Sequence, residues 1–323
     1  MARVVSMRQQ LLLVNYHYVR DPHAYPYPGI HPISPDAFAQ QIKLLASKLH
    51  IATPDEAEAF LLHGKALPRD SVLLTFDDGL VDHWETARNI LDPQGLKALF
   101  FVCTRPLTEH RAVPVHKIHW LRATTEPDRF RADLLAELPG EWRGRKLTDD
   151  ETRAAHATYI YDRPQDAEIK YLMNFLLPEE VVDVATSGML KRAGVSEANF
   201  CARTYMDGAA LRALEKSGHR VEAHTHDHRP VTRLGAEEEK LMSGHVRALA
   251  DVLGRKPTWI SFPFGRDWAL PQDPEAFCRR YGFAIGVTLK GTWVKPENAP
   301  YALDRINTNE VEQVVSERNV AVS

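Results

Sequence analysis

Residues 72–79 read Val-Leu-Leu-Thr-Phe-Asp-Asp-Gly, a mostly apolar run that ends in two carboxylates and a glycine. The β-branched and aromatic residues at 72–76 predict a buried strand. Carboxylates are costly to bury without a partner, so we expect Asp77 and Asp78 at the strand end, facing a cation or water. Because Asp-Asp-Gly also begins many ordinary turns, this stretch alone does not distinguish a metal site from a loop.

A second predicted strand ends in three imidazoles. Residues 221–228 read Val-Glu-Ala-His-Thr-His-Asp-His, and three histidines within five residues after a strand are rarely explained by packing alone. Two histidines and one carboxylate form a facial set that holds a catalytic divalent metal and leaves positions open for water and substrate. His224 and His228 can converge on one ion if the chain turns after Thr225, although spacing leaves His226 as an alternative ligand.

The two adjacent aspartates are expected to have different roles. Successive side chains of an extended backbone point to opposite sides, so Asp77 and Asp78 cannot contact one metal ion equally. We expect one of them to bind the metal and the other to accept a proton from the water that the metal activates. Such a metal lowers the pKa of water toward about 7 and polarises a substrate carbonyl.

Further strand-like runs alternate with helical segments. Additional buried strands are predicted at residues 11–16, 98–102, 259–262 and 283–288. Helices are predicted after the cap residues Ser34 and Thr53 and over residues 207–217 and 236–253. This alternation predicts an α/β fold with a mostly parallel sheet, open or closed into a barrel, whose active-site loops follow the strand C-termini.

The segment from about residue 105 to residue 203 lacks this regular alternation. It contains Asp/Glu/Arg clusters, proline breaks and short amphipathic pieces such as residues 171–184. A loop of that length needs a structure of its own. We therefore expect one domain over residues 1–323, with residues 105–203 as an inserted, partly helical subdomain or lid between two barrel strands.

Composition argues against several classes of function. The chain has 323 residues, of which 44% are hydrophobic and 26% charged, with a net charge of -3 and a pI near 6.6. These values fit a soluble globular protein and give no field that attracts nucleic acid or an anionic membrane. Residues 1–10 precede only a short apolar run, which indicates a strand and not a signal peptide, and no stretch is long enough for a transmembrane segment.

The cysteines indicate a reducing environment. The three of them, which form no CxxC pair, are Cys103, Cys201 and Cys278. An odd number of widely separated thiols suggests neither a disulfide framework nor a thiolate zinc site, so a cytoplasmic location is expected. The sequence leaves the oligomeric state open.

Three motifs together resemble those of the polysaccharide deacetylase family, also described as the NodB homology domain or carbohydrate esterase family 4. They are residues 75–79 (TFDDG), residues 224–228 in the pattern H-[ST]-x-x-H, and residues 261–265 (SFPFG). Their order and strand-end positions match the family. The resemblance covers residues 10–104 and 204–307, with weaker likenesses at Tyr16-His17 and residues 300–306, and implies a distorted (β/α)7 barrel.

The resemblance also implies a role for each motif residue. Asp77 would be the general base, and the backbone N–H of Phe264 would join the metal in holding the oxyanion formed when water attacks an acetamide carbonyl. The ligands of zinc, or of Co²⁺, Mn²⁺ or Ni²⁺ as alternatives, would be Asp78, His224 and His228. The intervening His226 is then not a ligand.

Two family features are missing from their usual places. Many members have an arginine that orients the base at the start of the third motif, where this chain has Ser261; Arg266 is a candidate replacement. The family's later motifs supply a histidine that protonates the leaving amine, but no histidine follows Gly265. The candidate acids, for each of which a surface or packing role is the alternative, are His17, His116 and His119.

Two further pairs of residues have open roles. Asp267 and Trp268 are candidates for the family's later aspartate and for an apolar wall of the acetyl pocket, or else for a helix cap and a core aromatic. Asp304 and Arg305 are expected to form a structural ion pair at the last strand, with substrate contact as the alternative for Arg305.

The leading hypothesis is metal-dependent deacetylation of an N-acetyl amino sugar. The apparent lack of an export signal favours a small nucleotide- or lipid-linked precursor in surface polysaccharide biosynthesis as the substrate. The insertion at residues 105–203 would then help to select that substrate. One alternative is a deacylase acting on an O-acetyl ester, a formamide or a non-sugar amide. Another is a catalytically silent carbohydrate-binding barrel, which has no chemical need for all four motif residues Asp77, Asp78, His224 and His228.

Overall fold

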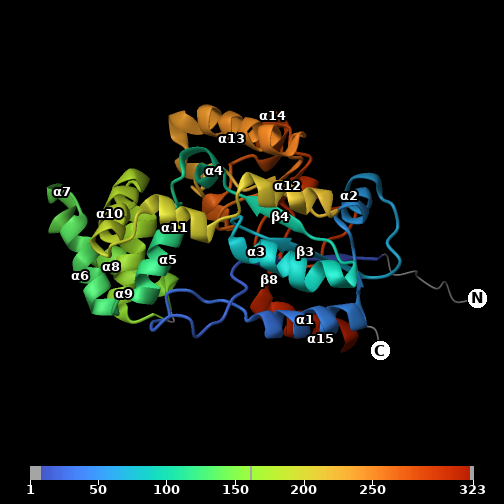
Figure 1. Cartoon of the computed structure of the whole chain (residues 1–323), viewed down its shortest axis with the longest axis horizontal. Helices are drawn as coiled ribbons and strands as arrows, with labels where there is room; N and C mark the ends of the chain where they lie inside the picture. The colour runs from blue at the N-terminus through green and yellow to red at the C-terminus, as the bar shows by residue number, and fades with distance from the viewer. Residues whose placement is uncertain (1–8, 161, 321–323) are drawn as a thin grey trace, which may run out of the picture. The chain divides into compact units, whose positions relative to one another are not determined.

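One parallel sheet organises the chain (Figure 1). The computed structural model describes residues 9–160 and 162–320, so part of the segment judged not to be a signal peptide, residues 1–8, lies outside the described residues. Within them the strand order is β7-β6-β5-β4-β3-β1-β8, and β2 pairs with β3. The strands are β1 (Leu11–Tyr16), β2 (His50–Ile51), β3 (Ser71–Phe76), β4 (Leu99–Val102), β5 (Arg220–Ala223), β6 (Trp259–Ser261), β7 (Ile285–Val287) and β8 (Ile306–Asn307).

The sheet curls into a half-barrel whose two ends are joined by irregular backbone. Val287 of β7 bridges to Leu303, shortly before β8, and Leu11 of β1 bridges to Val294 in the same connection. Every strand pair is parallel. The arrangement confirms the predicted distorted NodB-like β/α barrel. The strand β2 was not predicted, and the last strand, β8, was expected near residues 304–305 without bounds, because so short a segment has no periodicity to detect.

Alternation along the strands separates two apolar layers. The layer inside the barrel includes Leu11, Leu13, Leu73, Leu99, Phe101, Trp259 and Ile285. The intervening residues, such as Leu12, Val14, Leu74 and Phe100, belong to a larger cluster with residues of the surrounding helices. Successive strand side chains point to opposite faces, and both faces are covered, so the strands read as continuous apolar runs.

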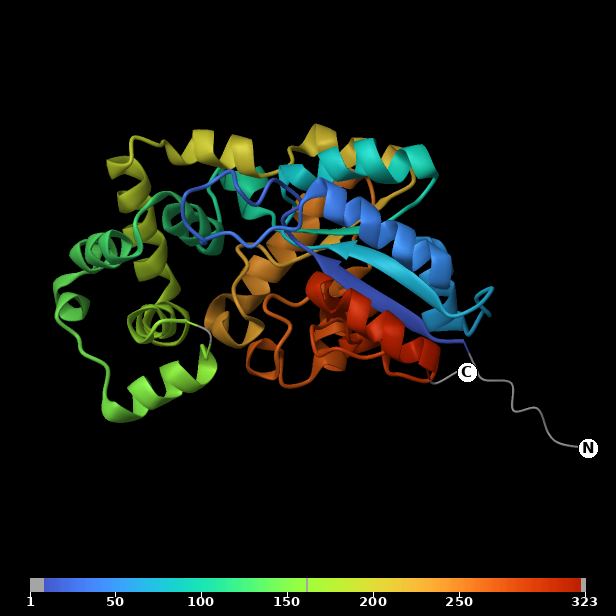
Figure 2. The ribbon, with the colours of Figure 1, turned by 90° about the horizontal axis from the view of Figure 1, so that it is seen from below.

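The helices of the barrel unit begin and end at the expected signals. They are α1 (Pro35–Lys48), α2 (Pro54–His63), α3 (Val81–Thr86), α4 (Arg105–Glu109), α12 (Gly208–Lys216), α13 (Glu238–Leu253), α14 (Pro274–Tyr281) and α15 (Val311–Val320). Ser34 caps α1, and Thr53 forms a capping box on α2, as predicted. Figure 2 shows α1 and α15 side by side over β1 and β3. No helix among residues 9–160 and 162–320 combines the length and apolarity that a membrane span requires.

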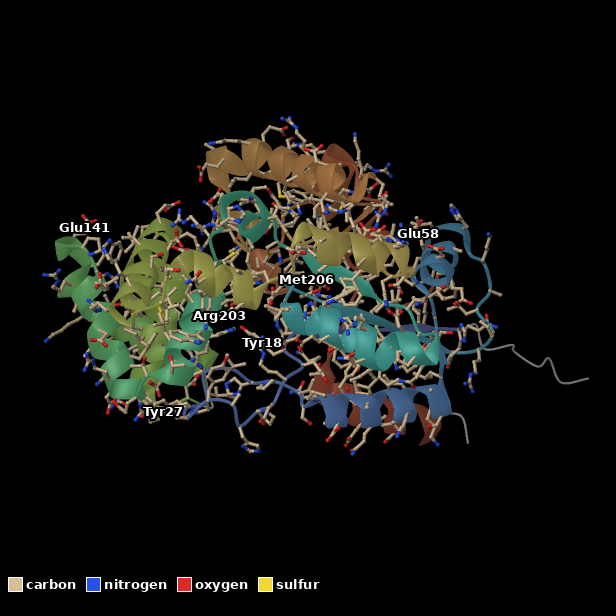
Figure 3. All side chains as sticks on the ribbon, in the orientation of Figure 1. Tyr18, Tyr27, Glu58, Glu141, Arg203 and Met206 are labelled. Atoms are coloured by element: carbon tan, nitrogen blue, oxygen red, sulfur yellow. The ribbon has the colours of Figure 1, made fainter. Side chains whose placement is uncertain are left out.

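A buried polar cluster closes the amino-terminal end of the barrel. Trp259 Nε1 donates to Glu58 of α2, a residue labelled in Figure 3, at 2.8 Å. Glu58 also pairs with Arg220 at 2.9 Å. The carboxylate of Glu222 accepts from the backbone N–H of Trp259 at 2.9 Å. Burial raises the pKa of Glu222, although Arg255 opposes that shift. These side chains join strand starts to one another, so their role is structural, and the chemistry belongs at the opposite end.

Residues 22–31 and 110–201 form a second compact unit. Its helices are α5 (Pro114–Thr124), α6 (Pro127–Glu137), α7 (Gly140–Arg143), α8 (Asp149–Thr158), α9 (Pro164–Tyr171) and α10 (Glu179–Arg192), and α11 (Glu197–Thr204) returns the chain to the barrel unit. The amphipathic piece expected over 171–184 is broken at Pro178, where α10 begins, because proline cannot continue a helix. The lid role of the insertion stays a prediction.

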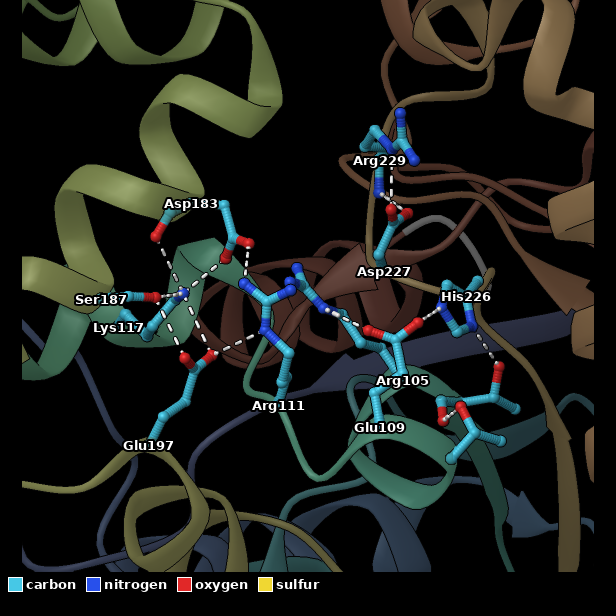
Figure 4. A network of polar contacts seen from close by, with 12 residues as sticks. Arg105, Glu109, Arg111, Lys117, Asp183, Ser187, Glu197, His226, Asp227 and Arg229 are labelled. Atoms are coloured by element: carbon cyan, nitrogen blue, oxygen red, sulfur yellow. Dashed lines mark hydrogen bonds and ion pairs between the residues drawn. The ribbon is translucent and has the colours of Figure 1, made fainter. Parts of the chain in front are cut away.

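A fully buried lysine holds this second unit together (Figure 4). Lys117 Nζ donates to a carboxylate oxygen of Asp183 at 2.5 Å and to Ser187 Oγ at 2.8 Å, and it pairs with Glu197 at 3.3 Å. Arg111 contacts the other oxygen of Asp183 at 2.5 Å. A buried cation with this many partners is a structural centre, not an unsatisfied charge.

Candidate active site

The carboxyl ends of β3, β5 and β6 bring the motif residues together. Asp77 and Asp78 follow β3, His224 follows β5, and Ser261 ends β6. Parallel strands end at the same edge of a sheet, so residues more than a hundred positions apart in sequence meet there. Asp77, Asp78, His224 and Ser261 are all buried.

Asp78, His224 and His228 form a compact ligand set. Asp78 Oδ1 lies 3.3 Å from His224 Nε2 and 3.4 Å from His228 Nε2, and the ligand atoms of all three residues lie within 4.8 Å of one another. His224 Nδ1–H donates to the carbonyl of Ser261 at 2.7 Å, which fixes the ring so that Nε2 faces the set. His224 Nε2 is buried and makes no hydrogen bond within the described chain.

This donor set fits a divalent cation. Two imidazole nitrogens and one carboxylate oxygen are the ligands of many catalytic zinc sites. Burial would lower the pKa of His224, but Asp77 and Asp78 outweigh that effect and raise it. The two carboxylates therefore favour positive charge at His224.

Unusual backbone angles aim these side chains. Five non-glycine residues of the described chain have positive φ, and four of them belong to the motifs: Asp78 (86°), Thr225 (60°), His228 (65°) and Phe264 (64°). Left-handed backbone is unfavourable for such residues and gathers at functional sites. The turn at Thr225 is the one needed for His224 and His228 to converge.

Asp77 faces a different partner from Asp78. Its two oxygens accept from Arg305, Nη1 to Oδ1 at 2.8 Å and Nη2 to Oδ2 at 2.6 Å, and Oδ2 also accepts from Ser261 Oγ at 3.0 Å. Burial would raise the pKa of Asp77, but the Arg305 guanidinium outweighs burial and holds that pKa well below its usual range. Asp77 is therefore an ionised carboxylate with a fixed orientation.

Two sequence predictions about arginine are wrong. Arg266 is exposed, whereas Arg305 contacts Asp77, and the ion pair of Arg305 is with Asp77 and not with Asp304. Asp304 instead accepts a hydrogen bond from Thr288 Oγ1 at 2.9 Å. An ion pair between neighbours in sequence was the simplest expectation, but Asp304 and Arg305 lie on a nearly extended segment, where successive side chains diverge.

The remaining donors of Arg305 are also satisfied. Nε donates to the Thr288 carbonyl at 3.0 Å, and Nη1 to Thr75 Oγ1 at 3.0 Å and Asn15 Oδ1 at 3.3 Å. The guanidinium carbon lies 5.5 Å from the centre of the Phe101 ring. A buried arginine with a complete set of acceptors is held rigidly in the barrel interior.

His17 lies beside Asp77. Tyr16 of β1 is opposite Phe76 of β3, so the following residues, His17 and Asp77, are adjacent at the strand ends. The charge of His17 adds to the lowering of the Asp77 pKa. The His17 carbonyl accepts from His83 Nε2–H at 2.9 Å, and burial lowers the pKa of His83 to about 4, so this support stays neutral.

The other two candidate acids belong to the second unit. His116 and His119 both lie on α5, and their ring centres are 6.1 Å apart. His116 is buried and His119 is half-buried. Their catalytic role stays a prediction.

The third motif forms a tight turn beside the ligand set. The Phe264 ring lies 5.1 Å from the His228 ring, and the Phe264 N–H donates to no other described residue. A Cβ at Gly265 would come within 2.6 Å of Leu289, so only glycine fits there. Trp268 is 40% exposed, which rules out the core-aromatic interpretation.

His226 is tied into a chain of hydrogen bonds next to the ligands. Its Nε2–H donates to Glu109 at 3.0 Å, and its Nδ1 accepts from Thr104 Oγ1 at 3.0 Å. Glu109 also pairs with Arg105 at 3.4 Å (Figure 4). Both ring nitrogens of His226 are therefore engaged away from Asp78, as expected for a residue that is not a ligand.

Comparison with known proteins identifies relatives of this chain. A family model described as polysaccharide deacetylase matches residues 64–132 and 178–281. IcaB from Ammonifex degensii is similar in structure with a TM-score of 0.58 and 19% identity, over 95% of this chain and 96% of that chain. The deacetylase PplD of Streptococcus pyogenes, solved in complex with acetate, gives a TM-score of 0.57 and 14% identity over 96% and 98%.

A third structure shares the fold as well. The de-N-acetylase of Aggregatibacter actinomycetemcomitans gives a TM-score of 0.52 and 13% identity over 92% of this chain and 94% of that chain. A search of curated protein sequences found no significant match.

Proposed function

The chain belongs to the polysaccharide deacetylase family, and we propose that it is a metal-dependent hydrolase that removes the acetyl group from the nitrogen of an N-acetyl amino sugar. The observation that carries this proposal is the division between the adjacent aspartates. Asp78 faces two imidazoles, while Asp77 faces Arg305 and Ser261. On this proposal one carboxylate would hold a cation, and its neighbour would accept a proton.

Asp78, His224 and His228 would hold the metal. The best match to two imidazoles and one carboxylate is Zn²⁺, with Co²⁺, Mn²⁺ and Ni²⁺ as alternatives. A divalent cation bound there supplies Lewis acidity toward water and toward a carbonyl oxygen.

Asp77 would act as the general base. Arg305 keeps it ionised, so it can accept a proton from an attacking water. The same bidentate contact limits the rotation of the carboxylate. The proton acceptor is thereby fixed beside the ligand set before substrate binds.

The Phe264 N–H would donate to the oxyanion. It has no acceptor among the described residues, and it belongs to the residue whose ring contacts His228. A preorganised backbone donor of this kind is typical of acyl-transfer sites.

His17 would protonate the leaving nitrogen. It lies beside Asp77 at the strand ends, and its backbone is held by the neutral His83. His116 and His119 are the alternatives.

Assay of acetate release tests this function. The protein loaded with Zn²⁺ is expected to release acetate and a free amine from a pentamer of N-acetylglucosamine, to lose that activity with a chelator, and to regain it when Zn²⁺ is restored. Comparing the pentamer with a nucleotide-linked N-acetyl amino sugar tests the narrower prediction of a glycan precursor.

The alternatives give different results in the same assay. The alternative deacylase would release acetate from an O-acetyl sugar, or formate from a formamide. It would release nothing from the N-acetyl compounds. Binding of the pentamer without acetate release would indicate a silent barrel.

A further inference from the structure

A tryptophan lies exposed at the rim of the third motif. Trp268 is 40% exposed, and the described chain has only two more exposed hydrophobic side chains of comparable size, Ile160 and Val184. Because Trp268 lies beside a motif residue, its exposed indole offers a flat apolar face that a ligand could cover.

Trp268 packs against the third motif. Its ring centre is 5.0 Å from that of Phe264 at an angle of 45°, and its carbonyl accepts from Thr232 Oγ1 at 2.9 Å. The preceding residue, Asp267, pairs with Lys290 at 2.5 Å. The ring contact with Phe264 limits the rotation of the indole before a partner binds.

A chain of ring contacts leads from the metal ligands to this indole. His228 contacts Phe264 at 5.1 Å, and Phe264 contacts Trp268 at 5.0 Å. The exposed surface of Trp268 thus begins two ring contacts from a ligand, next to the residue proposed to donate to the oxyanion.

We propose that Trp268 is a specificity residue that stacks on a pyranose ring attached to, or next to, the amide that is hydrolysed. The negative face of the indole matches the C–H groups on the face of a sugar, which carry slight positive charge. This inference rests on the proposed function and narrows it to substrates in which a sugar ring accompanies the acetamide.

Kinetics of Trp268→Ala and Trp268→Phe test the proposal. With the N-acetylglucosamine pentamer, Trp268→Ala is expected to raise KM about tenfold, equivalent to about 1.4 kcal/mol, with a smaller change in kcat. Trp268→Phe keeps an aromatic face and should recover most of the loss. With 4-nitrophenyl acetate, which has no sugar, both variants should behave as the wild type.

A matched control is Trp84→Ala. Trp84 is half-buried on α3, where Arg88 lies 5.9 Å from its ring centre, so this variant also removes one indole from the barrel unit. It should leave KM for the pentamer unchanged. An unchanged KM in Trp268→Ala, or an equal loss on 4-nitrophenyl acetate, would overturn the proposal.

Binding separates this inference from the proposed function. In the Asp77→Asn background, the affinity for the pentamer measured by calorimetry should fall about tenfold when Trp268→Ala is added. If the wild type releases no acetate but this Trp268-dependent affinity is found, the proposed function fails and the stacking role stands. If acetate is released and Trp268→Ala binds as well as its parent, only the stacking role fails. If neither the pentamer nor a nucleotide-linked N-acetyl amino sugar binds or releases acetate, both fail.

Discussion

Arg305 donates to both carboxylate oxygens of Asp77, a residue 228 positions earlier in the chain. The same guanidinium donates to Ser261 Oγ at 2.8 Å, the position where many members of the family carry an arginine. In this chain the guanidinium that contacts the proposed base, Asp77, comes from the segment before the last strand, and the small Ser261 leaves room for it.

Replacing Arg305 should impair both turnover and stability. In Arg305→Met, Asp77 keeps its burial but loses its cation, so we expect a fall in kcat of about 100-fold or more and a loss of about 3–5 kcal/mol in the free energy of unfolding. Acetate release and urea denaturation measure the two effects, and metal content should stay near one ion per chain.

The double variant Arg305→Met/Ser261→Arg is a direct check on this role. It returns a guanidinium to the family's usual position in the space that Arg305 vacates, and it should regain part of the lost activity. Full activity in Arg305→Met alone would show that Asp77 needs no orienting arginine.

Variants of the proposed metal ligands and of the proposed base should differ in how much metal they retain. His224→Ala and His228→Ala each remove one of three ligands and are expected to lose the ion and the activity together. Asp77→Asn should retain the ion, because Asp77 contacts Arg305 and not the ligand set, while losing turnover. Elemental analysis of the purified variants measures the ion, and an Asp77→Asn protein with wild-type activity would contradict the base assignment.

The variant His17→Gln should hydrolyse amides slowly but activated esters at nearly the wild-type rate. An amide nitrogen must be protonated to leave, so kcat on the pentamer should fall about 10²–10⁴-fold. Hydrolysis of 4-nitrophenyl acetate, whose leaving group needs no proton, should change little. The same two assays on His116→Gln and His119→Gln test the alternatives. If His17→Gln hydrolyses the pentamer and 4-nitrophenyl acetate at the same ratio of rates as the wild type, His17 is not the proton donor.

The sequence predicted best those features that depend on residues close together in the chain. The barrel, Asp77 and Asp78 at one strand end, and the turn at Thr225 could all be anticipated, because apolar strands, caps and motif spacing are local signals. Arg305 could not, since its contact with Asp77 depends on strand order, and β8 is only two residues long. Ser261 was the one sign in the sequence that another arginine contacts Asp77. It stands where the family usually has that arginine, but it does not indicate which residue replaces it.

The second unit should depend on Lys117. Replacing this fully buried lysine by methionine leaves Asp183 and Glu197 without their central cation, so we expect a loss of about 3–5 kcal/mol in the free energy of unfolding. The control Arg129→Met breaks a pair with Asp133 in which the arginine is 70% exposed, and it should cost less than about 1 kcal/mol. Equal losses in urea denaturation of the two variants would contradict the structural role of Lys117.

Acid should destabilise the barrel through His219. Its Nδ1 accepts from the Ala98 N–H at 3.1 Å, and its Nε2–H donates to Asp92 at 3.2 Å, so the ring must be neutral. Burial, aided by Lys97, lowers its pKa to about 4, although Asp92 opposes the shift. The unfolded chain binds this proton near pH 6.5 and the folded chain only near pH 4, so stability is complete above pH 6.5 and falls as the pH drops through that window. The slope from one such group approaches about 1.4 kcal/mol per pH unit.

The variant His219→Asn isolates this contribution from those of other histidines. Asparagine offers the Ala98 N–H a neutral acceptor that does not titrate, while it loses the ring contact with Phe100 at 5.4 Å. We therefore expect a variant that is less stable at pH 7 but loses less stability between pH 6.5 and pH 4. Urea denaturation across that range measures the difference, and parallel curves for wild type and variant would mean that folding does not change the pKa of His219.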